Sequence, residues 1–131
     1  MVEEELLLNF GTQIGATARA EGVEKHQLEI LLASLESIRD ERMCLLLTAA
    51  FAERQSKRKR ESQRELLGPK TAGNVVNALK ELYQKGATRK EARKMLGIAK
   101  WIYEASEGKN RESLQKVKSI EDFVNLISAR G

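Results

Sequence analysis

The chain has 131 residues, of which 41% are hydrophobic and 5% aromatic, and its formal net charge is +4. This length fits one domain, or one small domain with a helical extension. The single cysteine excludes an internal disulfide, and no apolar run approaches the roughly 18 residues that a membrane span needs. A secretory signal begins with positive charge, whereas this chain has three acidic residues at Glu3–Glu5. We therefore expect a cytoplasmic protein without a membrane partner.

The charge is divided unevenly along the chain. Residues 1–53 contain 4 basic and 10 acidic side chains, whereas residues 54–131 contain 19 basic and 9 acidic ones. Lys and Arg release counterions from a phosphate backbone when they bind it, so the basic part favours DNA or RNA as partner. The acidic part would be repelled by that partner, and we expect it to contact protein. The alternative for either part is a solvated charged face.

Apolar spacing predicts two helices in the acidic part. The first covers Glu3–Ala20 and carries Gly11 and Gly15 on one face, where they either admit a close neighbour or break the helix. The second covers Glu24–Arg39. The apolar residues expected to point inward are Leu6, Leu7, Phe10, Ile14 and Ala18 in the first helix, and Leu28, Leu31, Leu32, Leu35 and Ile38 in the second.

A third helix begins after Asp40, which can cap it, and no helix breaker follows before Gly68-Pro69, so it can run on through Glu65. We expect Met43, Leu46, Leu47, Ala50 and Phe51 to point inward and Cys44 to be a small buried hydrophobe. The second half is basic all round, so it is either a flexible charged connector or a segment that tracks phosphates. Its basic residues are Arg54, Lys57, Arg58, Lys59, Arg60 and Arg64.

Gly68-Pro69 is the best domain boundary, because proline lacks an amide donor and disfavours helix in the residue before it. It divides the chain into residues 1–67, expected to serve interaction or oligomerisation, and residues 70–131, expected to bind nucleic acid. Lys70, the first residue of the second part, is included among the expected contacts.

The basic part begins with a helix over Val75–Lys85. Thr88 can cap the next helix, with Glu91 at the capping-box spacing, and Gly97 is expected to end it. A further helix then starts at Ile98 and ends before Gly108. Three short helices with a glycine between the second and third have the layout of a helix-turn-helix unit.

Over Val75–Glu107 the chain resembles the trihelical helix-turn-helix of DNA-binding regulators. The likeness lies in the order Gly86-Ala87-Thr88, Glu91-Ala92, Leu96-Gly97-Ile98 and Tyr103. It implies a turn at Gly97 and an outward face of Lys100, Trp101 and Glu104 on a recognition helix, although we expect the Trp101 indole to be buried. An ordinary helical hairpin is the alternative. The implied nucleic-acid contacts are Arg89, Lys90, Arg93, Lys94 and Lys100.

At the C-terminal end Asn110 can cap a short turn, and Ser119 with Asp122 has capping-box spacing before a last helix. No sustained alternation of apolar and polar residues supports a strand. We therefore expect an all-α fold, a bundle of about six to seven helices with a C-terminal trihelical helix-turn-helix-like unit.

The sequence offers little for catalysis. His26 is the only histidine, and one His with one Cys cannot supply the usual zinc ligands, so we expect no enzyme activity, cofactor or metal. A basic helical chain of this kind, with its Arg54–Arg64 run, is similar in outline to the small subunits of CRISPR effector complexes. That likeness implies binding of guide RNA and target strand without sequence preference, within a larger complex. Our first interpretation is a non-catalytic DNA-binding protein of the helix-turn-helix type that forms a homo-oligomer through its acidic helices, and this complex subunit and a protein-interaction bundle are the alternatives.

Overall fold

A computed structural model describes residues 2–61 and 63–129, and this part of the chain contains seven helices and no strand. The expected all-α class is confirmed. The helices are α1 (Glu4–Ala20), α2 (Lys25–Leu35), α3 (Met43–Lys57), α4 (Pro69–Gln84), α5 (Arg89–Ala105), α6 (Arg111–Gln115) and α7 (Ile120–Ser128).

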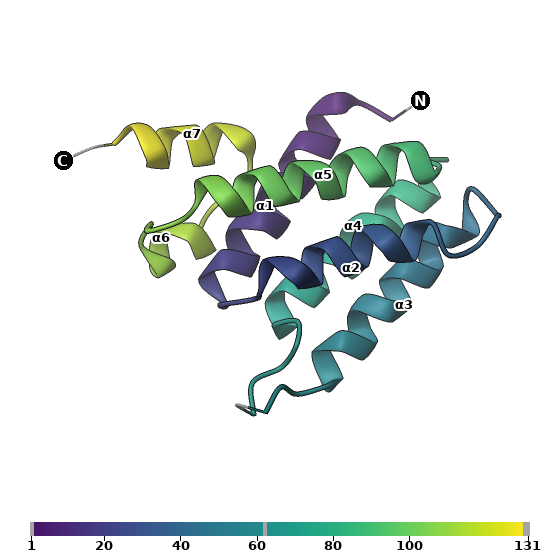
Figure 1. Cartoon of the computed structure of the whole chain (residues 1–131). Coiled ribbons are helices and arrows are strands. Elements are labelled where there is room, and N and C mark those ends of the chain that lie inside the picture. Colours follow the sequence, from purple (N-terminus) through teal and green to yellow (C-terminus); the bar gives the residue numbers. More distant parts are fainter. Residues whose placement is uncertain (1, 62, 130–131) are drawn as a thin grey trace.

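The centre of the bundle is the contact between α1 and α5, the most extensive helix pair in the molecule (Figure 1). A Cβ atom on Gly11 would lie 2.6 Å from the carbonyl oxygen of Met95, and one on Gly15 would lie 2.9 Å from the Cβ of Ile102. The two glycines therefore let the backbone of α1 lie close to both the backbone and the side chains of α5. Of the two predicted roles, close approach is correct and helix breaking is wrong.

Residues of α1 and α5 take part in two apolar clusters. The main cluster joins α1 to α5 and includes Ile14, Leu31, Leu45, Leu79 and Leu96. The second joins α1 and α5 to the C-terminal helices through buried Leu114, Val117 and Phe123. Helices from residues 1–67 and from residues 70–131 thus share one main core.

The ends of α2 and α3 differ from those predicted. Helix α2 ends at Leu35 instead of Arg39. The Arg89 guanidinium donates a hydrogen bond of 2.8 Å to the Leu35 carbonyl and so satisfies this acceptor at the helix end. Asp40 caps the start of α3 as predicted, since its carboxylate accepts from the amides of Arg42 and Met43 at 2.9 and 2.8 Å.

The helix does not run on to Glu65. It ends at Lys57, and the residues on either side of position 62 fold back on each other. The Leu66 amide donates to the Arg58 carbonyl at 2.9 Å, and the Arg60 amide donates to the Arg64 carbonyl at 2.7 Å. This return brings the following residue, Leu67, into the core, where it is 1% exposed. The free energy gained by burying Leu67 outweighs what a longer helix would gain, because a helix that is charged on all sides has no apolar face to pack.

The face of α3 that was expected to point inward points outward. Met43, Leu46, Leu47 and Ala50 are exposed, and only Phe51 of the predicted set is partly buried. Cys44 is buried as predicted. The residues of α3 that are buried in place of the predicted stripe are Cys44, Leu45, Thr48, Ala52 and Gln55.

The expected turn at Gly97 is also absent. Helix α4 begins at Pro69, earlier than Val75, and α5 is continuous through Gly97. Packing of Met95, Leu96 and Ile98 on α1 and its neighbours holds the helix across the glycine, whose backbone angle φ is not positive. The trihelical unit with a turn at this position is therefore not formed.

The local cap predictions are confirmed. Thr88 and Glu91 form the capping box of α5. Asn110 accepts from the Ser113 amide at 3.0 Å, and Ser119 accepts from the Asp122 amide at 3.0 Å. Trp101, by contrast, is 74% exposed, so its predicted burial is wrong.

The close approach of α1 and α5 predicts opposite effects for two glycine substitutions. Gly15→Ala places a methyl group against the backbone of α5 and should lower the free energy of unfolding by about 1–3 kcal/mol. Gly97→Ala meets no atom within 4 Å and should raise it by about 0.5–1 kcal/mol through helix propensity. Urea unfolding followed by circular dichroism measures both. Equal effects of the two variants would contradict the packing role of Gly15.

The capping box predicts a dependence on pH. The hydrogen bond from the Thr88 amide lowers the pKa of Glu91 below its usual 4.5. Glu91 therefore contributes stability that is present above that value and is lost as the pH falls through the lowered pKa. Glu91→Gln should cost about 1 kcal/mol at neutral pH, and the difference from wild type should shrink in acid. Unfolding measured across this pH range would contradict the role of Glu91 if the difference stayed constant.

Candidate nucleic-acid interface

The basic residues of α5 are paired with carboxylates from the acidic half of the chain. Arg93 lies 2.5 Å from Glu36 and Lys100 lies 3.3 Å from Glu29. Lys94 contacts Glu4 in the same way. Lys90 forms no ion pair among the described residues. The outward side of α5 is thus largely neutralised by the protein itself, which removes the expected row of unpaired cations on this helix.

Arg89 is a structural residue. Its side chain is 11% exposed, and its guanidinium donates to the carbonyls of Leu35 and Ile38 at the end of α2. Glu41 accepts from the same guanidinium at 3.1 Å. These contacts join α5 to α2 and leave Arg89 poorly placed to meet a phosphate.

Exposed ion pairs also connect the two halves of the chain. The Lys94 hydrogen bond, and then its charge, lower the pKa of Glu4. Lys25 lies 2.5 Å from Glu104, and its hydrogen bond lowers the pKa of Glu104 while that carboxylate raises the pKa of Lys25.

The 54–64 basic run is divided among several neighbours. Lys57 pairs with Glu53 at 3.3 Å, and Arg60 pairs with Glu24 at 2.7 Å. Arg54 donates to the side chain of Gln55 and lies over the Phe51 ring. Among the described residues, Arg58 and Lys59 have no side-chain partner, and Arg64 turns toward α1. The run is therefore not one continuous phosphate-tracking surface.

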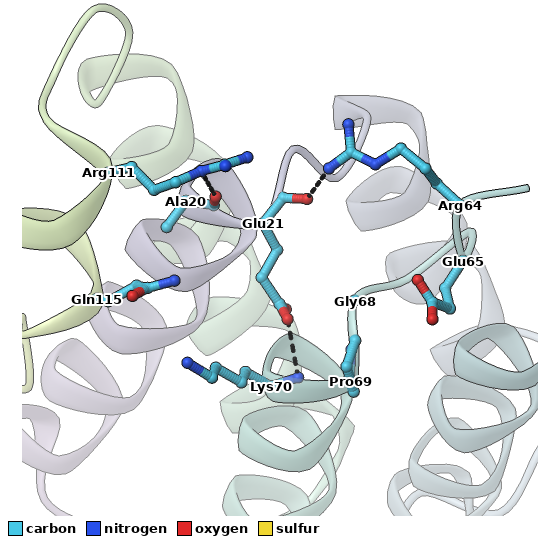
Figure 2. Close-up of a pocket in the computed structure, with 9 residues that line it drawn as sticks. All are labelled: Ala20, Glu21, Arg64, Glu65, Gly68, Pro69, Lys70, Arg111 and Gln115. Atoms are coloured by element: carbon cyan, nitrogen blue, oxygen red, sulfur yellow. Dashed lines mark hydrogen bonds between the residues drawn. The ribbon is translucent and has the colours of Figure 1, made fainter. Parts of the chain in front are cut away.

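A cationic groove lies elsewhere, between the C-terminal half of α1, the N-terminal half of α4, and α6. It consists of two adjoining hollows of about 300 and 320 Å³ that share Lys70 and Gln115. Figure 2 shows the first hollow, with Arg111 and Gln115 reaching in from α6 and Arg64 from the loop before α4. We call it the α1–α4–α6 groove. Its cationic side chains are Arg64, Lys70, Arg111 and Lys118.

Two of these cations are held by the end of α1. Arg64 donates to the Glu21 carbonyl at 2.8 Å, and Arg111 donates to the Ala20 carbonyl at 2.6 Å. Cationic groups are stabilised at a helix C-terminus by the helix dipole. Each guanidinium has five N–H donors, so both keep donors for a ligand.

The carboxylate of Glu21 fills the anion position at the start of α4. It accepts from the amides of Lys70 and Thr71 at 3.1 and 2.7 Å, and from the Thr71 hydroxyl at 2.6 Å. It packs directly against Gly68, where a Cβ would collide with it. The helix N-terminus offsets the charge of Glu21, so this acid opposes an incoming anion less than an unbound carboxylate would.

Amide side chains line the second hollow. Asn74 donates to the Thr17 hydroxyl at 3.1 Å, while the side chains of Gln13, Asn77 and Gln115 have no hydrogen-bond partner among the described residues. Amides both donate and accept, so they suit sugar hydroxyls and base edges. The groove lining includes no histidine or cysteine.

The structure brings only two of the predicted contacts, Arg64 and Lys70, into this groove. Sequence reasoning missed Arg111 and Lys118, and also the amide residues of α1 and α4. A signal was present in residues 109–118, where Lys109, Arg111, Lys116 and Lys118 stand against one acid, Glu112. The predicted contacts that lie outside the groove lining are Arg54, Lys57, Arg58, Lys59, Arg60, Arg89, Lys90, Arg93, Lys94 and Lys100.

No protein-family model matches the chain, and neither a curated protein nor a solved structure shows significant similarity to it. In the described part of the chain, no helix combines the length and the apolar character required to cross a bilayer. The groove therefore has to be interpreted from its own geometry.

The position of Arg89 predicts a stability effect. Arg89→Met removes the donor that serves the carbonyls at the end of α2 and should lower the free energy of unfolding by about 2–3 kcal/mol. The neighbouring Lys90→Met, at an exposed position, should change it by less than about 0.5 kcal/mol. Chemical denaturation measures both. A loss no larger for Arg89→Met than for Lys90→Met would contradict the structural role.

Proposed function

We propose that the protein is a non-catalytic nucleic-acid-binding protein and that it holds a phosphate backbone in the α1–α4–α6 groove. One observation carries this proposal: cations from three separate segments, namely Arg64, Lys70, Arg111 and Lys118, converge on one groove. Elsewhere many of the expected contacts are already paired with the protein's own acids.

The charges in the groove favour an anionic ligand. Four cations face two acids, Glu21 and Glu65, and Glu21 is already held by donors at the start of α4. The ammonium groups of Lys70 and Lys118 contact no carboxylate in the described part of the chain. A lysine that neutralises a phosphate releases a counterion from the nucleic acid to solvent, which is the main source of non-specific affinity.

Backbone-directed binding to a single strand is favoured over reading of duplex sequence. Helix α5 has no turn at Gly97, so it does not present a separate recognition helix, and α6 has only 5 residues. The amides beside the cations can contact sugars and bases in many sequences. This mode also suits a subunit that lies along RNA or DNA within a ribonucleoprotein complex.

Substitution of the groove lysines tests the proposal. Lys70→Gln combined with Lys118→Gln should weaken binding of a single-stranded oligonucleotide about tenfold at low salt. It should also reduce the slope of log affinity against log salt by about 1.4, because each neutralised phosphate of a single strand contributes about 0.7. Fluorescence anisotropy with single-stranded and duplex DNA and RNA at two salt concentrations provides both quantities.

The matched control is Lys80→Gln combined with Lys85→Gln, which changes the net charge equally. Both control lysines are exposed and lie outside the groove lining, at the other end of α4. The control should keep most of the affinity and of the salt slope. Equal loss in the two double variants would show that only overall charge matters, and the absence of any binding by wild type would overturn the proposal.

A further inference from the structure

The two hollows of the α1–α4–α6 groove differ in chemistry. Three of the four cations, Arg64, Lys70 and Arg111, line the first hollow together with both acids. The lining of the second hollow includes no carboxylate, and apart from Lys70 and Lys118 its polar side chains are amides and one hydroxyl. One groove thus joins a charged part to a neutral part whose amides can both donate and accept hydrogen bonds.

The amides of the second hollow come from three helices and face one space. Gln13 and Thr17 lie one turn apart on α1, and Asn74 and Asn77 lie one turn apart on α4. Gln115 joins them from α6 (Figure 2). The bond to Thr17 fixes the Asn74 amide, whereas the other three amides have no partner within the described part of the chain and remain available to a ligand.

Gly73 lies on the same face of α4, in the lining of the second hollow. A Cβ atom added to it would meet no atom within 4 Å, and its φ is not positive, so neither packing nor backbone conformation requires a glycine there. Glycine is also less favourable than alanine inside a helix. What the missing side chain does provide is an open stretch of α4 backbone that a ligand in the hollow can approach closely.

We propose that the second hollow receives one nucleobase of the bound strand, held at its edge by the amides and lying against the α4 backbone at Gly73. An amide presents a donor beside an acceptor, which matches the edge of an unstacked base. The lining includes no aromatic ring on which a base could stack, so the edge is the part that is recognised. At about 320 Å³ the hollow lies at the small end of ligand pockets, which range over roughly 300–1,000 Å³, and it suits a single base.

This inference rests on the proposed function, because phosphates bound by Lys70 and Lys118 would bring the strand to the hollow that both lysines line. It adds one requirement that backbone binding alone does not have. The affinity must depend on whether the strand carries bases, and that dependence must come from the amides rather than from the lysines.

Two single-stranded DNA oligonucleotides of equal length separate these contributions, one of mixed sequence and one abasic at every position. In fluorescence anisotropy, wild type should bind the base-bearing strand about tenfold more tightly, the value of one good pair of hydrogen bonds to a base edge. Asn77→Ala combined with Gln115→Ala should remove most of this difference and leave the affinity for the abasic strand unchanged. Lys70→Gln combined with Lys118→Gln should weaken the binding of both strands by the same factor.

The matched control for the amides is Gln84→Ala combined with Asn125→Ala. It removes the same two kinds of side chain at exposed positions outside the groove lining. This control should keep the full preference for the base-bearing strand.

Gly73→Ala provides an independent test with two readouts that move in opposite directions. It should raise the urea midpoint of unfolding through helix propensity, yet lower the affinity for the base-bearing strand about fivefold or more, because the added methyl group overpacks the contact with the base. Gly97→Ala, on α5 and outside the groove, should raise the midpoint in the same way and leave both affinities unchanged. A purely structural role of Gly73 would give the two variants the same behaviour.

Equal binding of the two strands by wild type would overturn this inference and leave the proposed function intact. Failure of wild type to bind either strand would overturn the proposed function, and this inference with it. A preference for bases that survives both Gly73→Ala and the Asn77 and Gln115 substitutions would place the base outside the second hollow and so contradict the assignment. The helical circular-dichroism signal of each variant confirms that it is folded.

Discussion

The backbone-close packing of α5 on α1 is the constraint on which the other features depend. Gly11 and Gly15 remove the side chains that would separate the two helices, so α5 lies flat along α1 and remains one helix across Gly97. The C-terminal helices then cover the remaining side of this pair through Phe123 and its neighbours. The end of α1 is thereby placed beside α4 and α6, where the groove forms.

The same packing explains why charge along the sequence differs from charge on the surface. Helix α5 is basic and residues 1–53 are acidic overall, and the fold sets them against each other, as the pairing of Arg93 with Glu36 and of Lys94 with Glu4 shows. Exposed pairs of this kind contribute little to stability. Their larger effect is to lower the positive potential of α5, whereas the groove lysines Lys70 and Lys118 contact no carboxylate among the described residues.

The parts of the fold that could be predicted are those decided within a few residues. The capping box of Thr88 and Glu91 and the cap at Ser119 form locally, and so their sequence spacing was sufficient. The rotation of α3 could not be predicted, because the helix has two candidate inward faces and the buried one was chosen by partners such as Ser34 and Gln27, distant in sequence. The groove was missed for the same reason, since its cations come from three separate segments.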